Sequence, residues 1–354
     1  MQMNSWQVES FGKPLVQALR EVPTPAGTEV VLRIASCGVC HSDVHMHDGY
    51  FDRGGGHRLD LSRTVQPPRT LGHEIAGQVA AVGPDAQGVQ VGDRRVAYPW
   101  IGCGGCALCA AGQEHLCTTP RALGVARDGG FASHVLVPHP RYLVEHGTIP
   151  DEQACTYACA GLTAYSALRK VGPLAPDDAL LVLGAGGVGL SGIRMARHLC
   201  KVAPIVAEPD RAKWDLAREA GASDVIDPGE AVTLKSFLKA TRGGAAAVVD
   251  FVGSNASFDF GLGALRKGGK MVCVGLIGGA STVVPAMLAL KAVSITGSYV
   301  GSLQELHELM ALARAGALPP LPLNLRPLAD ANQALDELRA GKVRGRLVLR
   351  PAGA

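Results

Sequence analysis

From residue 177 onward, short apolar runs alternate with segments that have the pattern of helices. The expected strands are residues 179–183, 204–207, 246–252 and 270–276, and the expected helices include 188–198 and 212–220. Parallel strands need a long crossover connection, which is usually a helix, so this alternation is typical of βαβ units. The pattern therefore predicts an α/β fold with a doubly wound parallel sheet.

The ends of the chain have a different pattern. Strands separated by glycine, proline or polar residues are expected at 29–35, 77–82, 95–98 and 132–137, with no regular helix between them. Near the C-terminus we expect helices at 304–313 and 331–338 and a final strand at 346–349. That strand could join a β-rich N-terminal domain. We therefore expect residues 161–297 to form a nucleotide-binding domain inserted into a catalytic domain made of 1–160 and 298–354.

A glycine-rich turn follows the first strand of the alternating region. Its residues are Gly184, Gly186, Gly187, Val188 and Gly189, and they include the pattern GxGxxG. Glycine makes up 45 of the 354 residues, so the pattern alone carries little weight. Its position between a strand and an apolar-faced helix gives it meaning, because the backbone could approach a pyrophosphate at the helix N-terminus.

Glu208 ends the next expected strand, at the place where an acidic residue binds the ribose hydroxyls of NAD. Its carboxylate would repel the 2′-phosphate of NADP, so we expect a preference for NAD. Arg211 lies three residues further on and could either reach a phosphate or remain solvated on a helix face.

Four cysteines, Cys103, Cys106, Cys109 and Cys117, have the spacing CxxCxxCx7C. Four thiolates suit a closed, structural zinc site. Iron-sulfur ligation is an alternative, but the ferredoxin spacing places the fourth cysteine closer and before a proline. Cysteines that only pack against one another are a third possibility.

A second set of candidate ligands is dispersed along the chain. It consists of Cys40, His73 and Cys159, each in a glycine-containing motif. Two thiolates and one imidazole leave a fourth position for water or substrate, which is the open geometry of a catalytic zinc.

The motifs GVCHSD, GHE, CAGLTAY and GAGGVG, together with the four cysteines, occur in one order along nearly the whole chain. In this the sequence resembles the zinc-dependent alcohol dehydrogenases of the medium-chain dehydrogenase/reductase family. The resemblance implies a GroES-like catalytic domain, a Rossmann-type domain, two Zn²⁺ per chain and NAD. It also implies reversible oxidation of primary or secondary alcohols to aldehydes or ketones, with zinc as Lewis acid and hydride transfer to NAD.

The resemblance assigns roles to individual residues. Cys40, His73 and Cys159 match the catalytic zinc ligands, Glu74 an acid that can approach the metal, and Asp43 the carboxylate that orients His73. Further positions match a proton relay (Ser42, His45), the surroundings of the cofactor phosphates (His41, Arg346), other cofactor contacts (Thr163, Lys213) and the wall of the substrate pocket (Trp100, Ala122).

Two other functions are compatible with the residues. One is a zinc-dependent polyol or sugar dehydrogenase, although those relatives often lack a complete four-cysteine lobe. The other is a non-catalytic protein that binds zinc and nucleotide and senses redox state.

The partners expected from composition are few. A net charge of +3 gives no reason to expect nucleic acid, and no apolar stretch predicts a signal peptide or a membrane span. We expect a cytoplasmic homodimer or homotetramer that acts on a small alcohol or carbonyl compound. A loop at residues 51–66 either borders the substrate entrance, contacts a neighbouring subunit or is a plain surface loop.

Overall fold

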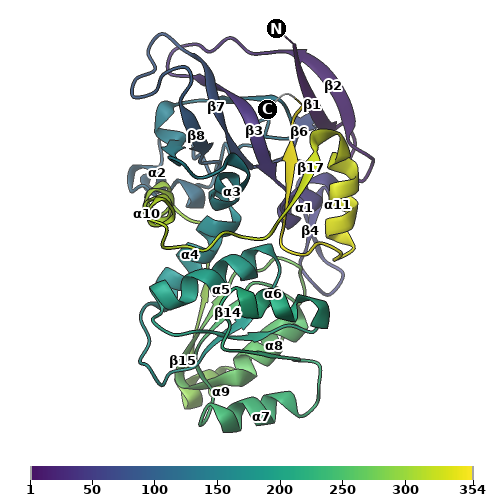
Figure 1. Ribbon diagram of the computed structural model, residues 1–354. Helices are drawn as coiled ribbons and strands as arrows, with labels where there is room; N and C mark the ends of the chain where they lie inside the picture. The colour runs from purple at the N-terminus through teal and green to yellow at the C-terminus, as the bar shows by residue number, and fades with distance from the viewer. Residues whose placement is uncertain (1, 353–354) are drawn as a thin grey trace. The chain divides into compact units, whose positions relative to one another are not determined.

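The computed structural model describes residues 2–352, and the contacts within it divide the chain into two compact units (Figure 1). The first unit contains the chain up to Tyr50, Asp60–Leu162 and the chain from Gly301 onward. The second contains Phe51–Leu59 and Thr163–Val300. Between residues 2 and 352, no helix is long and apolar enough to cross a membrane.

The second unit is built on a six-stranded parallel sheet with the order β13-β12-β11-β14-β15-β16. Its strands are β11 (Leu180–Leu183), β12 (Ile205–Ala207), β13 (Asp224–Ile226), β14 (Ala245–Asp250), β15 (Leu265–Cys273) and β16 (Ser294–Gly297). The helices are α5 (Gly187–Leu199), α6 (Trp214–Glu219), α7 (Thr233–Ala240), α8 (Asn255–Ala264) and α9 (Pro285–Lys291). Helices α5 and α6 cover one face and α7 to α9 the other (Figure 1), which confirms the predicted doubly wound sheet.

The core of this sheet explains why its strands are so apolar. Leu181, Val248 and Met271 lie on neighbouring strands and are fully buried. Phe237 of α7 and Ala264 of α8 pack against the same face. Burying one such large side chain contributes about 1.5–3 kcal/mol, and parallel strands covered on both faces bury side chains on both. The packed strands hold their carboxyl ends, and the turns that follow them, in fixed positions.

The first unit is mostly β. A seven-stranded sheet has the order β10-β8-β7-β3-β18-β17, with β9 also paired to β3, and a three-stranded sheet has the order β2-β1-β6. The strands are β1 (Gln2–Val8), β2 (Val16–Glu21), β3 (Val30–Gly38), β6 (Arg69–Thr70), β7 (Glu74–Val82), β8 (Arg94–Ala97), β9 (His134–Val137), β10 (Leu143–Glu145), β17 (Leu323–Pro327) and β18 (Arg346–Arg350). Strand β18 pairs with Cys37 and Gly38 of β3, so the C-terminal strand joins the N-terminal sheet as predicted.

Helices of the first unit lie between these strands in the sequence. They are α1 (His41–Asp48), α2 (Ala107–Ala110), α3 (Asp151–Ala154), α10 (Leu303–Arg314) and α11 (Ala331–Arg339), and α4 (Ala160–Val171) begins in this unit and continues into the second. Helices α10 and α11 match the two predicted near the C-terminus.

The expectation of no regular helix among the N-terminal strands was wrong, because α1 lies between β3 and β7. The backbone N–H of Cys40 donates to Asp43 Oδ2 at 2.8 Å, which caps the first turn. Gly49 ends the helix with a φ of 81°, a conformation that favours glycine. The segment has no clear apolar stripe, so its helical signal lies in these end residues rather than in periodicity.

A hairpin of β4 (Tyr50–Asp52) and β5 (Arg58–Asp60) occupies much of the loop whose role the sequence left open. Residues 51–59 pack with the second unit. A Cβ atom added to Gly54 would lie 2.3 Å from the backbone of Gly279, and one added to Gly278 would lie 2.6 Å from the carbonyl oxygen of Asp52. Glycines on both segments therefore allow direct contact between their backbones.

Candidate metal and nucleotide sites

Cys40, His73 and Cys159 are far apart in the sequence but meet in the first unit. Cys40 precedes α1, His73 precedes β7, and Cys159 immediately precedes α4. All three side chains are buried, and one potential ligand atom from each lies within 4.8 Å of the others. The two Sγ atoms are 4.0 Å apart. The structure thus brings together the three residues proposed to hold a catalytic zinc.

Asp43 fixes the orientation of His73. Its Oδ1 lies 3.0 Å from His73 Nδ1 and also accepts a hydrogen bond from the backbone N–H of Gly72. His73 Nε2 is buried and has no hydrogen-bond partner among the residues described. A metal-binding imidazole commonly donates one N–H to a carboxylate and presents its other nitrogen to the metal. The arrangement at His73 fits that pattern.

The charges around this cluster favour a thiolate. A hydrogen bond from Cys159 is the main cause that holds the pKa of Cys40 well below its usual value, and Arg346 and His73 act in the same direction. Burial alone would lower the pKa of His73, but Asp43 and Cys40 outweigh it and raise that pKa. Two sulfur ligands and one imidazole are a donor set that suits zinc.

Glu74 and Arg346 form a buried ion pair beside the cluster. The Arg346 guanidinium contacts both carboxylate oxygens of Glu74, and Nε lies 3.0 Å from Oε2. Glu74 Oε1 also accepts the backbone N–H of Ala160 at 2.9 Å. Both oxygens of Glu74 are therefore already engaged, and Arg346 is buried against an acid.

The four cysteines of the second candidate metal site also converge. One sulfur from each of Cys103, Cys106, Cys109 and Cys117 lies within 4.8 Å of the others. Backbone N–H groups point at these sulfurs: Cys103 N lies 3.3 Å from Cys117 Sγ, and Thr119 N lies 3.4 Å from the same atom. A backbone hydrogen bond from Gly105 is the main cause that lowers the pKa of Cys103 to about 6. The pKa of Cys117 is also lowered, mainly by the backbone N–H of Cys103, whereas burial raises the pKa of Cys109 to about 11. Four convergent sulfurs fit a closed tetrahedral zinc site.

Glu114 anchors this cysteine lobe, although no sequence motif points to it. The residue is 4% exposed. Its Oε2 accepts hydrogen bonds from the backbone N–H of Gly102 and the hydroxyl of Tyr142, at 3.2 and 2.7 Å. Its Oε1 lies 2.7 Å from Arg141 Nη2. The partners Arg141 and Tyr142 lie outside the cysteine motif, so only the folded chain identifies the contact.

The proposed relay residues lie on α1. Ser42 and His45 are three residues apart, so their side chains share a face of the helix, and both are half-buried. His41, at the first position of the helix, is exposed, and its ring centroid lies 5.5 Å from that of His45.

The glycine-rich turn lies at the carboxyl end of β11 in the second unit. Gly184 has a φ of 88°, and α5 begins at Gly187. A Cβ on Gly189 would lie 2.0 Å from the carbonyl oxygen of Gly184, so this position requires glycine. The turn therefore brings backbone N–H groups to a helix N-terminus, where they could bind an anion.

Glu208 lies directly beside this turn. Its Oε2 accepts the backbone N–H of Ala185 at 2.8 Å, and its Oε1 accepts that of Asp210 at 2.9 Å. Only 5% of the residue is exposed. The acid at the end of β12 is thus held rigidly next to the turn at the end of β11.

Two further predicted cofactor contacts, Thr163 and Lys213, also belong to the second unit. Thr163 is 8% exposed, and its Oγ1 has no hydrogen-bond partner among the residues described. Lys213 Nζ lies 3.6 Å from Asp210 Oδ2. The cofactor roles of both residues stay predictions.

Comparison with known proteins identifies the family of this chain. Residues 26–151 match the alcohol dehydrogenase GroES-like domain family, and residues 187–315 match the zinc-binding dehydrogenase family. The NAD-dependent alcohol dehydrogenase of Sulfurisphaera tokodaii is 37% identical over 351 residues, which cover 99% of this chain and 100% of that protein. The chain belongs to the zinc-dependent alcohol dehydrogenase family.

Other members of the family are similar over their whole length. The NAD-dependent alcohol dehydrogenase of Saccharolobus solfataricus is 36% identical over 99% of this chain and 100% of its own. The crystal structure of the alcohol dehydrogenase from the archaeon Aeropyrum pernix has a TM-score of 0.87 and 30% identity, covering 98% of this chain and 100% of that one. The similarity to the family therefore extends over both units of the chain.

In this alcohol dehydrogenase family member, Trp100 lies against His73, one of the three candidate metal ligands. Its ring centroid is 5.2 Å from that of His73, and its Nε1 donates to the carbonyl oxygen of Ala158 at 3.1 Å. Ala122 is also buried, with 5% exposure. The position of Trp100 agrees with a wall near the metal, and the substrate-pocket roles of both residues stay predictions.

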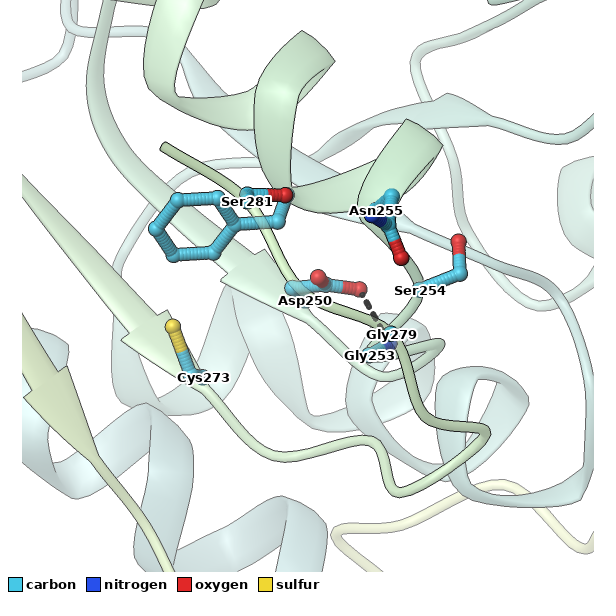
Figure 2. Close-up of a pocket in the computed structure, with 8 residues that line it drawn as sticks. Asp250, Gly253, Ser254, Asn255, Cys273, Gly279 and Ser281 are labelled. Carbon is cyan, nitrogen blue, oxygen red and sulfur yellow. Dashed lines mark hydrogen bonds between the residues drawn. The ribbon is translucent and has the colours of Figure 1, made fainter. Parts of the chain in front are cut away.

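A cavity of about 280 Å³ opens at the carboxyl ends of β14 and β15 in this family member (Figure 2). Asp250, Ser254, Asn255 and Cys273 line it, together with Gly253, Phe258, Gly279 and Ser281. Asp250 accepts the backbone N–H groups of Val252 and Gly253, and burial raises its pKa. This cavity could not be predicted from the sequence, because its lining comes from strand ends, the start of α8 and loops that carry no motif.

Proposed function

We propose that this chain is an NAD-dependent zinc alcohol dehydrogenase that interconverts primary or secondary alcohols and their aldehydes or ketones. The observation that carries the proposal is the buried cluster of Cys40, His73 and Cys159, in which Nε2 of His73 has no hydrogen-bond partner within residues 2–352. Three protein ligands leave one coordination position for substrate, as catalytic zinc sites require. The names of the full-length relatives support the same activity.

Each group would have a distinct part in the reaction. Zinc would supply a Lewis acid for the alcohol oxygen, and NAD would supply the hydride acceptor. Asp43 would keep His73 in the orientation that presents Nε2 to the metal. Ser42 and His45 would carry the hydroxyl proton toward solvent, since an imidazole can both accept and release a proton.

The cofactor would bind on the second unit. The glycine-rich turn and the N-terminus of α5 would bind the pyrophosphate, and Glu208 would bind the adenosine ribose. Thr163, Lys213, His41 and Arg346 are proposed as further contacts. A buried carboxylate at Glu208 supports NAD over NADP.

We further propose a second, structural zinc held by Cys103, Cys106, Cys109 and Cys117, giving two zinc ions per chain. Glu74, whose oxygens contact Arg346 and Ala160, would approach the catalytic zinc only after losing one of those contacts. Trp100 and Ala122 would form part of an apolar pocket for medium-chain or aromatic alcohols.

The proposal includes a homodimer or homotetramer. Strand β16 is at one end of the six-stranded sheet, and all four of its residues are exposed. Large apolar side chains nearby are also exposed, namely Leu276, Ile277, Val284, Met287 and Leu290. An open edge strand beside an apolar patch supports contact with another subunit. Ten unpaired cysteines support a reducing, cytoplasmic location.

The experiment is a steady-state assay of NAD reduction over a panel of alcohols that varies in chain length, branching and aromatic character. Cys159→Ser should abolish turnover of every alcohol that the wild type oxidises. Cys155→Ser is the matched control, because Cys155 is an equally buried thiol outside the ligand cluster. Full activity of Cys159→Ser, or no turnover of any alcohol by zinc-loaded wild type, would refute the proposal.

A further inference from the structure

We propose that Glu230 is a specificity-determining residue that restrains Arg211 and so keeps it from binding the 2′-phosphate of NADP. The inference rests on the proposed function, because it assumes that a nicotinamide dinucleotide binds beside Glu208. It assigns to Glu230, which no motif includes, a part in the choice between NAD and NADP.

The first step concerns the place where a 2′-phosphate would lie. Glu208 has a buried carboxylate fixed by the backbone N–H groups of Ala185 and Asp210. A ribose bound to this carboxylate would bring any 2′-phosphate close to a negative charge that cannot move away. NADP could bind well there only if a nearby cation were available to offset the repulsion.

Arg211 is the nearest candidate in the sequence, but it is already engaged. It begins the short helix η4 (Arg211–Lys213), and its Nη2 lies 3.0 Å from Glu230 Oε1. Its guanidinium also lies over the ring of Trp214, 5.2 Å from the centroid. Trp214 is itself held in place, because its Nε1 donates to the carbonyl oxygen of Glu208 at 2.8 Å. Arg211 is therefore held between an acid and an aromatic ring.

The other basic residues of this region also have acidic partners. Lys213 Nζ lies 3.6 Å from Asp210 Oδ2, and Arg218 Nη1 lies 3.1 Å from Asp215 Oδ1. The Arg218 guanidinium also lies over the Trp214 ring, 5.5 Å from its centroid. The pair of Asp215 and Arg218 thus resembles the pair of Glu230 and Arg211 in charge and in its contact with Trp214.

The effect of Glu230→Gln on NADP binding should be small, because the ion pair that it breaks is exposed to solvent. The side chains of Arg211 and Glu230 are 69% and 52% exposed, and exposed ion pairs change an equilibrium by at most about fivefold. Glu230→Gln should therefore tighten NADP binding by about two- to fivefold and leave NAD binding nearly unchanged. The effect should be largest in a Glu208→Gln background and should shrink at high salt.

The test measures equilibrium dissociation constants of NAD and NADP by calorimetry on the zinc-loaded protein, so it does not depend on turnover. Glu230→Gln is compared in two backgrounds, wild type and Arg211→Ala. The proposal predicts tighter NADP binding only where Arg211 is present. Equal tightening in both backgrounds, or none in either, would overturn it.

Asp215→Asn is the matched control, since it removes one negative charge from the same surface and releases Arg218 instead. It should leave the ratio of the two dissociation constants unchanged, and a ratio shifted as far as in Glu230→Gln would contradict the assignment. Dinucleotide binding by the wild type distinguishes failure of this inference from failure of the proposed function. If it binds NAD and Glu230→Gln has no effect, only the inference fails, whereas a wild type that binds neither dinucleotide overturns both.

Discussion

Asp43 Oδ1 lies 3.0 Å from His73 Nδ1, while Asp43 Oδ2 accepts the backbone N–H of Cys40. One buried carboxylate therefore contacts two of the three segments that contribute candidate ligands to the catalytic metal. It orients the imidazole and fixes the start of α1, where Cys40 lies. The geometry of the cluster depends on this residue as much as on the ligands themselves.

Replacing Asp43 should weaken metal binding without removing a ligand. Asp43→Asn keeps the size of the side chain but loses the charge that orients His73. Partners of metal-binding histidines typically contribute about 10- to 100-fold to metal affinity, so a loss of that size is expected in a competition titration with a zinc chelator. Asp48→Asn is the control, because Asp48 lies on the same helix and pairs with Arg339 instead. Wild-type affinity in Asp43→Asn would contradict this role.

Removing one sulfur from the four-cysteine site should lower the thermal stability of the protein. Cys109→Ser removes one of four convergent sulfurs, and a structural zinc couples directly to folding. We expect destabilisation of about 2 kcal/mol or more, which corresponds to a fall in Tm of roughly 3 °C or more, measured by calorimetry. Cys273→Ser, at a half-buried cysteine outside both clusters, should stay close to wild type. If Cys109→Ser and Cys273→Ser have the same Tm, the four cysteines do not hold a stabilising metal.

The parts of the fold that follow short-range patterns could be predicted from the sequence. Strands β11, β12 and β14 are nearly continuous apolar runs because both faces of a parallel sheet are covered. The four cysteines of the lobe lie within 15 positions, so their spacing alone indicated a shared site.

Contacts between distant segments could not be predicted in the same way. Glu74 and Arg346 are 272 positions apart, and nothing in either segment indicates a pair. Glu114 is recognised as an anchor only because the short helix η2 (Pro140–Tyr142), just before β10, brings Tyr142 beside it. Helix α1 was missed since its signals are a capping Asp43 and a terminal Gly49, which do not produce a periodic pattern.

His45 is expected to act as a base in the proton relay. His45→Gln should keep zinc content and cofactor binding while slowing alcohol oxidation near neutral pH by about tenfold, at the low end of general-base effects. Higher pH should restore part of the rate, because solvent base can then accept the proton. The measurement is a pH-rate profile under conditions in which chemistry limits turnover. An unchanged profile would remove His45 from the relay, and lost zinc would make its role structural.

Asp151 should give the first unit a pH-dependent contribution to stability. Burial by itself raises its pKa, but contacts with His146 and Arg94, at 3.0 and 3.1 Å, outweigh burial and hold the pKa below its usual value. The ionised carboxylate therefore stabilises the fold above the unfolded-state pKa, about 4, and this contribution is lost as pH falls through the lower folded-state value. Asp151→Asn should be less stable than wild type in denaturant titrations at pH 7, and the difference should shrink below about pH 4. If the difference in stability between wild type and Asp151→Asn does not vary with pH, ionisation of Asp151 is not its cause.

The most direct test of the account is the zinc content of the purified protein, measured in the same samples as alcohol turnover. Wild type should contain two zinc ions per chain and be active. Cys159→Ser should contain one and be inactive, with a smaller loss of stability than Cys109→Ser. A wild type that oxidises alcohols with a single zinc, or a Cys159→Ser variant that retains both zinc ions and full activity, would contradict the assignment of Cys40, His73 and Cys159 as the catalytic metal site.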